Sequence, residues 1–308
     1  MIPPRKILVI RGGALGDFIL TLPVLAALRR HFPSCALEIL GYERTASLAV
    51  AAGLADRVSA LESPALAGFF ARDGAWHAKE TEYFSGFDLV VSYIYDPEKI
   101  FQSNVSRCNN TAQFLAGPHR SNESNGCHAT KAFLAPLEIL GVLDPDPCPR
   151  LILPSVPNPS AAPTAPQLAV HPGSGSAQKN WPEAKWAGLL QRLAATTRWH
   201  FLLIGGEAEE GRCERLAAAL PLERVQLAQN LPLVNLARAM RSCAAFIGHD
   251  SGITHLAAAL DLPGLVLWGP SNESVWRPVS NKMRLLRDER GLNFLPAEVV
   301  WQEASTLI

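Results

Sequence analysis

Short runs of apolar residues that alternate with helical patterns constrain the fold of this chain most strongly. Residues 7–10 (ILVI) and 168–170 (LAV) are apolar at every position. A strand without polar side chains must be covered on both faces, as in a parallel sheet that lies between two layers of helices. We therefore predict an α/β protein built on parallel sheets.

The predicted elements fall into two sets that repeat the same alternation of strands and helices. Strands are predicted at Lys6–Arg11, Ala36–Gly41, Arg57–Leu61, Phe87–Tyr95, Gln167–His171, Trp199–Gly205, Val225–Leu227, Ala244–Gly248 and Gly264–Trp268. Helices are predicted at Phe18–His31, Glu183–Thr197, Glu209–Leu220, Leu233–Ser242, Ile253–Leu260 and, as a closing helix, Pro296–Ile308. Each set has the pattern of a Rossmann-like domain.

A proline-rich stretch separates the two sets. Residues 144–166 carry eight of the 24 prolines, and proline cannot occupy helix interiors or central strands. The length of 308 residues also exceeds the roughly 250–300 residues at which a single core stops growing. We predict domains at 1–150 and 167–308, joined by a linker at 151–166, with the segment 296–308 free to pack elsewhere.

Two segments fit this alternation poorly and are predicted to be long loops, which are often functional or mobile. They are Gly68–Ser85 and Ser103–Gln113. The first is rich in aromatic side chains, namely Phe69, Phe70, Trp76, Tyr83 and Phe84. We favour an apolar cluster beneath the loop, with stacking on sugar rings as the alternative.

Composition excludes several classes of protein. The 28 Lys and Arg residues balance 28 Asp and Glu residues, so no overall field attracts nucleic acid. The apolar runs are too short to span a membrane, and the first residues lack the apolar segment of a secretory signal, so we expect a cytoplasmic protein.

The six cysteines are scattered along the sequence and are expected to be free thiols. No metal site is predicted, because histidines and cysteines never occur at paired ligand spacing.

A glycine-rich turn follows the first predicted strand. Gly12, Gly13 and Gly16 do not have the spacing of the G-x-G-x-x-G dinucleotide fingerprint. The turn instead delivers the carboxylate of Asp17 to the start of a helix, at the edge where parallel sheets bind ligands. From the residues alone, an N-cap of that helix is the favoured role of Asp17, and a carboxylate that faces a bound ligand is the alternative.

Three strand ends in the second half carry polar or glycine-rich loops. His171–Pro182 contains small and hydroxyl residues and delivers Lys179 just before a helix, as a diphosphate would need. Gly205–Glu210 places carboxylates where they could bind ribose hydroxyls, and Gly248–His255 is another glycine turn into a helix. These loops predict a nucleotide site on the second domain.

The motifs together resemble glycosyltransferase family 9, of the ADP-heptose:lipopolysaccharide heptosyltransferase type. The matching segments are Arg11–Pro33, His171–Pro182, Gly205–Glu210 and Gly248–Pro270. The resemblance implies a GT-B fold with two facing Rossmann-like domains, an interdomain cleft and the donor on the C-terminal domain. It also implies an inverting, metal-independent and cofactor-free transfer of a heptose or related sugar from a nucleoside diphosphate sugar such as ADP-heptose.

Carried over residue by residue, the resemblance places the proposed general base on Asp17 and the phosphate-binding lysine on Lys179. The ribose-binding glutamate falls on Glu210 or, one register off, on Glu209. The remaining donor-binding candidates are Ser174, Gly175, Ser176, Asp250, Ser251, Gly252 and His255, and the acceptor-side candidates are Gly13, Arg107 and Arg120. For His255, a buried structural role is the alternative.

The resemblance implies a glycan or glycolipid acceptor in lipopolysaccharide biosynthesis. Charges after the third predicted strand nearly balance, with Arg57, Arg72 and Lys79 among Glu62, Asp73, Glu80 and Glu82, so we expect an acceptor less acidic than the inner core. We also expect a monomer with no nucleic-acid partner, and leave open a peripheral contact with the inner membrane. Two other functions remain open, an NAD(P)-dependent Rossmann oxidoreductase and a noncatalytic sugar-nucleotide-binding protein.

Overall fold

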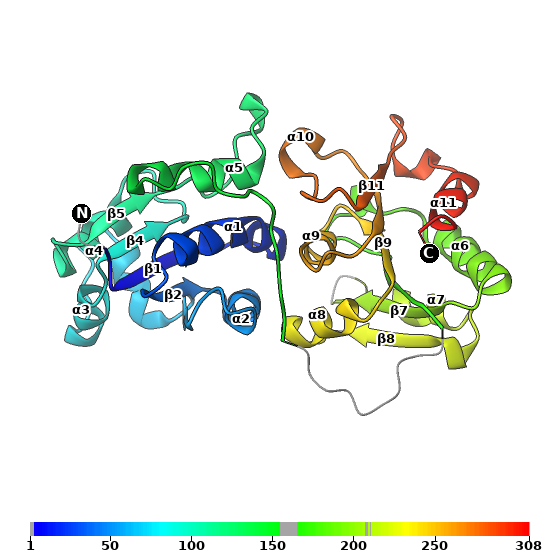
Figure 1. Cartoon of the computed structure of the whole chain (residues 1–308), viewed down its shortest axis with the longest axis horizontal. Coiled ribbons are helices and arrows are strands. Elements are labelled where there is room, and N and C mark those ends of the chain that lie inside the picture. Colours follow the sequence, from blue (N-terminus) through cyan, green and yellow to red (C-terminus); the bar gives the residue numbers. More distant parts are fainter. Residues whose placement is uncertain (1–2, 155–164, 207–208, 210, 308) are drawn as a thin grey trace. The chain divides into compact units, whose positions relative to one another are not determined.

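The computed structural model describes residues 3–154, 165–206, 209 and 211–307. It divides into two compact units, Met1–Leu151 and Ile152–Ile308, each with its own sheet (Figure 1). Part of the predicted linker, 155–164, lies outside the described residues.

The N-terminal unit is built on a five-stranded parallel sheet. Its strands are β1 (Lys6–Arg11), β2 (Ala36–Gly41), β3 (Arg57–Ala60), β4 (Leu89–Ser92) and β5 (Gln113–Ala116), in the order β3-β2-β1-β4-β5. The central strand β1 has four consecutive side chains, residues 7–10, that are at most 1% exposed. This burial confirms the prediction that continuous apolar runs form a parallel sheet covered on both faces.

Helices cover both faces of this sheet. The described part of the unit has the helices α1 (Leu15–His31), α2 (Glu43–Ala51), α3 (Ala78–Ser85), α4 (Ile100–Cys108) and α5 (Ala129–Leu134), with a 3₁₀ segment at Pro64–Phe70. α1 and α5 pack against each other (Figure 1), whereas α4 packs against α3 and the 3₁₀ segment. Leu8 and Ile10 of β1 belong to the core under α3 and α4.

The two segments predicted to be long loops contain regular structure, so that prediction is wrong. α3 forms within Gly68–Ser85, and α4 and β5 occupy most of the region around Ser103–Gln113. These helices are short, and each places only a few apolar residues on the core, which hides the helical period in a polar sequence. The apolar-cluster interpretation is confirmed, since Phe69 stacks on Trp76 with ring centroids 4.4 Å apart and Phe84 is fully buried.

The C-terminal unit has a six-stranded parallel sheet. The strands are β6 (Gln167–His171), β7 (His200–Gly205), β8 (Val225–Gln229), β9 (Ala245–His249), β10 (Gly264–Leu267) and β11 (Met283–Leu286), in the order β11-β10-β9-β6-β7-β8. The helices are α6 (Glu183–Thr196), α7 (Arg212–Ala217), α8 (Leu233–Arg241), α9 (Gly252–Ala259), α10 (Glu273–Trp276) and α11 (Ala297–Ala304). The predicted closing helix is therefore α11, and it packs against α6.

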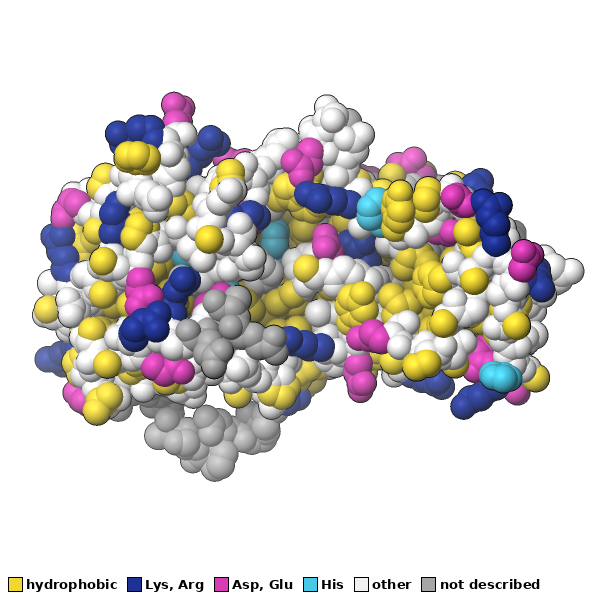
Figure 2. Space-filling view, turned by 180° about the vertical axis from the view of Figure 1, so that it is seen from behind, with side chains coloured by type: hydrophobic (Ala, Val, Ile, Leu, Met, Phe, Trp, Pro, Cys, Tyr) yellow, Lys and Arg dark blue, Asp and Glu magenta, His cyan; other side chains and the backbone are white. Residues whose placement is uncertain are grey.

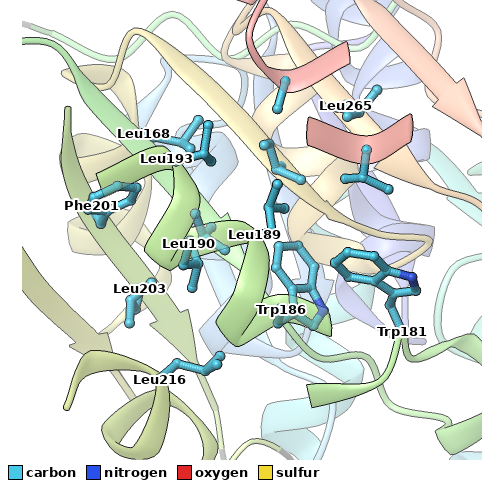
Figure 3. Packing of buried hydrophobic residues seen from close by; sticks show 14 of the residues in the cluster. Leu168, Trp181, Trp186, Leu189, Leu190, Leu193, Phe201, Leu203, Leu216 and Leu265 are labelled. Carbon is cyan, nitrogen blue, oxygen red and sulfur yellow. The ribbon is translucent and has the colours of Figure 1, made fainter. Parts of the chain in front are cut away.

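One face of this sheet is covered by α6, α7 and α11, which share a single core. Figure 3 shows Trp186, Leu189, Leu190 and Leu193 of α6 lying over the strand residues Phe201 and Leu203. Trp186 is fully buried and meets Trp181 edge to face, with ring centroids 5.4 Å apart. This cluster anchors the loop that precedes α6, which is the predicted phosphate-binding loop.

The surface carries both signs of charge. Figure 2 shows Lys and Arg side chains interspersed with Asp and Glu side chains over both units on the face in view. None of the described helices has both the length and the apolar character needed to cross a membrane.

Replacing Trp186 tests the anchoring core. We expect Trp186→Ala to lower the free energy of unfolding by about 3–5 kcal/mol, because it removes a large buried ring and leaves a cavity. Trp186→Phe should cost less, since it keeps a ring and removes an indole N–H that has no hydrogen-bond partner among the described residues. Urea denaturation followed by circular dichroism measures both values. Equal losses would contradict the packing role of the ring.

Candidate functional site

The C-terminal unit has its topological switch point between β6 and β9. The chain adds β7 and β8 on one side of β6 and then crosses to place β9 on the other side. Loops leaving two such strands diverge, and the crevice between them is where open parallel sheets bind ligands. The loop 172–182 after β6 and the turn 250–251 after β9 meet there. Both were predicted donor-binding segments.

Lys179 and Asp250 form an ion pair at this switch point. The Lys179 Nζ donates to Asp250 Oδ2 at 2.6 Å, and the side chains are 31% and 7% exposed, respectively. Lys179 comes from the loop after β6 and Asp250 from the end of β9, so the pair joins residues 71 positions apart. The structure thus brings together two residues that were predicted separately, and it leaves the ammonium partly open to solvent.

His249, the last residue of β9, holds the two loops together. Its Nε2 accepts the backbone N–H of Trp181 at 2.8 Å, and its Nδ1 lies 3.2 Å from the carbonyl of Gly173. Because a backbone N–H can only donate and a carbonyl can only accept, the ring is neutral with its proton on Nδ1. Burial lowers the pKa of His249 to about 3, which keeps this form at neutral pH.

In the loop after β6, some of the small residues are buried and support the loop, whereas others are open to solvent. Ser174 is buried, and its hydroxyl lies 2.8 Å from both Ser176 O and Asn180 Oδ1, to one of which it donates. Gly175 is exposed, and no atom lies within 4 Å of the position that a Cβ would occupy. The predicted role of Ser174 in donor binding stays a prediction, and Gly175 and Ser176 provide the open part of the loop.

Glu209 lies close to the same loop. It is buried, and its Oε2 accepts the backbone N–H of Gly206 at 2.9 Å. A Cβ on Gly173 would come within 2.1 Å of Glu209 Oε1, so the glycine at 173 makes room for the carboxylate. His171 Nε2 lies 3.9 Å from Glu209 Oε1, and burial lowers the pKa of His171 to about 4. The alternative glutamate, Glu210, lies outside the described residues.

The start of α9 carries the remaining donor-binding candidates. Ser251 is the N-cap residue, and its Oγ accepts the Thr254 N–H at 3.4 Å and lies 3.3 Å from His171 Nδ1. Gly252 is the first residue of the helix, and its backbone is partly exposed. His255 is buried on the first turn. The positive end of the α9 dipole therefore lies beside Asp250.

In the N-terminal unit, Asp17 lies in the first turn of α1. The helix begins at Leu15 with Ala14 as its N-cap, so Asp17 is the third helical residue and not the N-cap that was one of its two interpretations. Its Oδ2 accepts the Ala14 N–H at 3.2 Å, and the side chain is 30% exposed. Gly13 has φ +94°, and a Cβ there would lie 3.0 Å from Asp17 Oδ2. Gly13 thus leaves room for this carboxylate.

Arg11, the last residue of β1, lies beneath Asp17 and is 2% exposed. Its guanidinium donates to the carbonyls of His119 at 2.8 Å and Asp17 at 3.2 Å, and it packs on the Phe133 ring at 4.5 Å. One guanidinium nitrogen lies 3.7 Å from Asp17 Oδ1. Burial lowers the pKa of Arg11, and the charge of Asp17 opposes that shift. Because a guanidinium stays protonated in proteins, the Asp17 carboxylate has a cationic neighbour.

The two predicted acceptor-side arginines lie at different ends of the N-terminal sheet. Arg120 follows His119 at the carboxyl end of β5 and pairs with Glu123 at 3.0 Å. Arg107 is in the last turn of α4, which returns toward the amino end of the sheet, and its guanidinium lies over the Trp76 ring at 4.7 Å. The structure therefore brings Arg120, and not Arg107, to the edge that carries Asp17.

Sequence reasoning missed two residues of these sites. His249 carries no recognisable signal in the sequence, because its partners are backbone groups of a loop far away in the chain. Arg11 carried a usable signal, a charged residue that ends an otherwise apolar central strand. Among the described residues, no group of three or more His, Cys, Asp or Glu side chains could hold a metal ion.

Comparison with solved structures defines the class of fold. The chain superposes on E. coli ADP-heptose LPS heptosyltransferase II with a TM-score of 0.78, 18% identity and coverage of 98% of both chains. The E. coli heptosyltransferase WaaC with ADP gives a TM-score of 0.72 at 20% identity, covering 98% of this chain and 100% of that chain. The fold is of the GT-B type, as predicted.

Sequence comparison then shows which family the chain resembles. The model described as glycosyltransferase family 9 (heptosyltransferase) matches residues 155–293. Lipopolysaccharide heptosyltransferase 1 of Pseudomonas aeruginosa is 39% identical over 112 residues, which are 36% of this chain and 31% of that protein. The aligned part thus spans about a third of that relative's length. Over these segments the chain is similar to proteins of glycosyltransferase family 9, of the heptosyltransferase type, and the predicted resemblance is confirmed.

The neutral histidine at the switch point predicts a loss of stability in acid. The pKa of His249 is about 3 in the folded protein but about 6.5 in an unfolded chain. The unfolded state therefore binds this proton first, and stability falls as pH drops from about 6.5 toward 3, by up to about 1.4 kcal/mol per pH unit. Urea denaturation at a series of pH values measures the slope.

The variant His249→Asn isolates this contribution. It should be less stable than the wild type at pH 8, and the difference between the two proteins should shrink as the pH falls below about 6.5. A constant difference across this range would show that His249 does not titrate as the structure indicates.

Proposed function

We propose that the protein is an inverting glycosyltransferase that moves a heptose or a related sugar from a nucleoside diphosphate donor to an acceptor of the lipopolysaccharide-core type. Asp17 is the general base in this proposal, and the C-terminal unit binds the donor. ADP-heptose is the donor that we propose, because a similar heptosyltransferase structure contains ADP and similar proteins are named lipopolysaccharide heptosyltransferases.

The observation that carries the proposal is the partly exposed Lys179 ammonium, which Asp250 holds at 2.6 Å at the switch point of the C-terminal sheet. The exposed backbone of Gly175 lies in the same loop. An ammonium, backbone amides and a helix N-terminus beside Asp250 suit the phosphates of a nucleotide. These residues also lie within the segment that matches the family model.

Donor cleavage would place negative charge on the departing nucleoside diphosphate. The Lys179 ammonium and the backbone amides of the loop after β6 would stabilise that charge, because the fold already holds these groups in position before the charge develops. The second carboxylate oxygen of Asp250 is then free to accept a hydroxyl of the donor sugar, because a carboxylate accepts several hydrogen bonds. No metal ion is needed for this arrangement.

The acceptor hydroxyl would be activated in the N-terminal unit. In the proposed step its oxygen bonds to the anomeric carbon from the side opposite the diphosphate, the bond from that carbon to the diphosphate breaks, and Asp17 takes the hydroxyl proton. The 30% exposure of Asp17 leaves its carboxylate accessible to a hydroxyl, and Arg11 and the Ala14 N–H fix its position.

We infer that the reaction takes place in the cytoplasm, where the protein meets a glycolipid acceptor at the inner face of the membrane. In this proposal the protein is a monomer.

The variant Lys179→Ala tests the donor site. We expect ADP binding to weaken about 10- to 100-fold, because a hydrogen bond to a charged group contributes about 1.5–3 kcal/mol, and transfer should fall with it. Isothermal titration calorimetry with ADP measures the affinity.

Lys282→Ala is a matched control for this experiment. Lys282 also pairs with an aspartate at 2.6 Å, Asp261, but it precedes β11 at the opposite edge of the same sheet. This variant should bind ADP like the wild type. Equal ADP affinity in Lys179→Ala and in the wild type would show that Lys179 is a solvated loop residue.

The variant Asp17→Asn tests the general base. We expect transfer to fall by about 10²–10⁴-fold while ADP affinity stays unchanged, because the amide cannot accept the proton. The asparagine oxygen can still accept the Ala14 N–H, so stability should change little. Initial rates with ADP-heptose and a deacylated lipopolysaccharide core oligosaccharide measure the effect.

Asp88→Asn is the corresponding control. Asp88 likewise accepts backbone amides, those of Arg5 and Lys6, but it lies at the amino edge of the sheet. If Asp17→Asn turned over as fast as Asp88→Asn, Asp17 would not be the base.

A further inference from the structure

The N-terminal unit has a surface pocket of about 240 Å³ that the donor-site residues do not line. Its walls come from the segment between Ser92, the last residue of β4, and Gln102 in α4, and from β5 and the turn that follows it, between Phe114 and His119. β4 lies next to β1 on the far side from β2, so the pocket adjoins the switch point of this sheet. Ligands of open parallel sheets bind at that position.

Tyr95 presents an aromatic surface at this pocket. Its side chain is 70% exposed, and its ring meets the His119 ring at a centroid distance of 4.8 Å and an interplanar angle of 67°. The contact with His119 restricts the orientation of the Tyr95 ring and leaves much of it open to solvent. A large exposed aromatic side chain in a pocket lined by both apolar and polar residues suits a ligand with one apolar face and several polar groups. A pyranose ring has this character, because its C–H bonds form one face and its hydroxyls surround it.

The backbone beside Tyr95 is held in an unusual conformation. Lys99 has φ +55°, a left-handed conformation that is unfavourable for a non-glycine residue and that often marks functional sites. Asp96 stabilises this turn, because its carboxylate accepts the N–H groups of Phe101 at 3.2 Å and Gln102 at 2.9 Å. The Asp96 carboxylate is therefore occupied by backbone N–H groups of its own turn. Lys99 and Gln102 supply polar groups to the pocket wall.

The pocket is connected to Asp17 through Arg11. The Arg11 guanidinium donates to the His119 carbonyl at 2.8 Å and to the Tyr93 carbonyl at 3.4 Å, and it lies 3.7 Å from Asp17 Oδ1. A single guanidinium group therefore separates the backbone of the pocket wall from the proposed base. Gly117 allows close packing of the two walls, because a Cβ there would lie 2.3 Å from Tyr93 Cε1.

We propose that this pocket binds a sugar ring of the acceptor glycan, with Tyr95 stacked on the C–H face of the ring and with Lys99 and Gln102 bonding its oxygen substituents. The proposal rests on the proposed function, since it assigns the acceptor subsite of that reaction. Tyr95 is a binding residue here. Its removal should weaken acceptor binding and leave both donor binding and the chemical step intact.

The kinetic test compares Tyr95→Ala with the wild type, using ADP-heptose and a deacylated lipopolysaccharide core oligosaccharide as substrates. We expect the acceptor KM to rise about tenfold or more in Tyr95→Ala, with kcat and ADP affinity unchanged. Tyr95→Phe, which keeps the ring, should show a smaller rise. Phe294→Ala removes another exposed aromatic ring, 53% exposed in the C-terminal unit, and should keep the wild-type KM. A wild-type KM in Tyr95→Ala would overturn the subsite and leave the proposed transferase function standing.

A binding measurement separates the subsite from the activity. Saturation-transfer NMR detects contact of the same oligosaccharide with the wild type and with Tyr95→Ala in the absence of donor. If the wild type transfers no sugar, the proposed function fails, and this measurement alone decides the subsite. A signal in the wild type that disappears in Tyr95→Ala supports the sugar pocket. An equal signal in both proteins, or none in the wild type, overturns it.

Discussion

In each unit the chain adds two strands on one side of its first strand and then crosses to the other side, and this reversal determines where chemistry can occur. The loops that leave β1 and β4, or β6 and β9, diverge at the carboxyl edge of the sheet. Backbone N–H and C=O groups beyond the ends of these strands have no partner within the sheet, so they must form hydrogen bonds with other groups. Asp17 is found at one of these edges, and the pair of Lys179 and Asp250 at the other. The central strands of each sheet are apolar and buried.

The two units satisfy the backbone at these edges by different chemistry. The N-terminal unit uses a buried cation, because the Arg11 guanidinium collects carbonyls from three separate segments. The C-terminal unit uses a neutral ring, His249, which accepts from one backbone amide and donates to one carbonyl. A guanidinium can only donate, whereas a neutral imidazole can do both. Each residue matches the backbone groups at its edge, which are carbonyls around Arg11 and one amide and one carbonyl around His249. The Arg11 cation also places a positive charge beside Asp17.

The sequence predicts the elements whose pattern depends only on local burial. β1, β2 and β6 have the predicted bounds, because each is dominated by buried apolar residues, although β2 also contains Glu38. α2, α4, β5 and β11 were missed because they are short and bury only part of their residues. For the site, motif order indicates Lys179 and Asp250 individually, but their contact depends on the order of strands in the sheet. The role of His249 depends on tertiary backbone partners, which no spacing along the chain reveals.

The contact between Lys179 and Asp250 means that the ammonium of the proposed phosphate-binding loop already has a carboxylate partner. An incoming anion does not meet a vacant positive charge, because it must compete with a buried carboxylate that is 2.6 Å from the ammonium. Anions with a single diffuse charge gain little from that exchange, whereas a group with several charges and several acceptor oxygens can engage the ammonium and the loop amides together. If the loop binds phosphate as we propose, the pair would therefore favour a polyanionic group over small anions with a single charge.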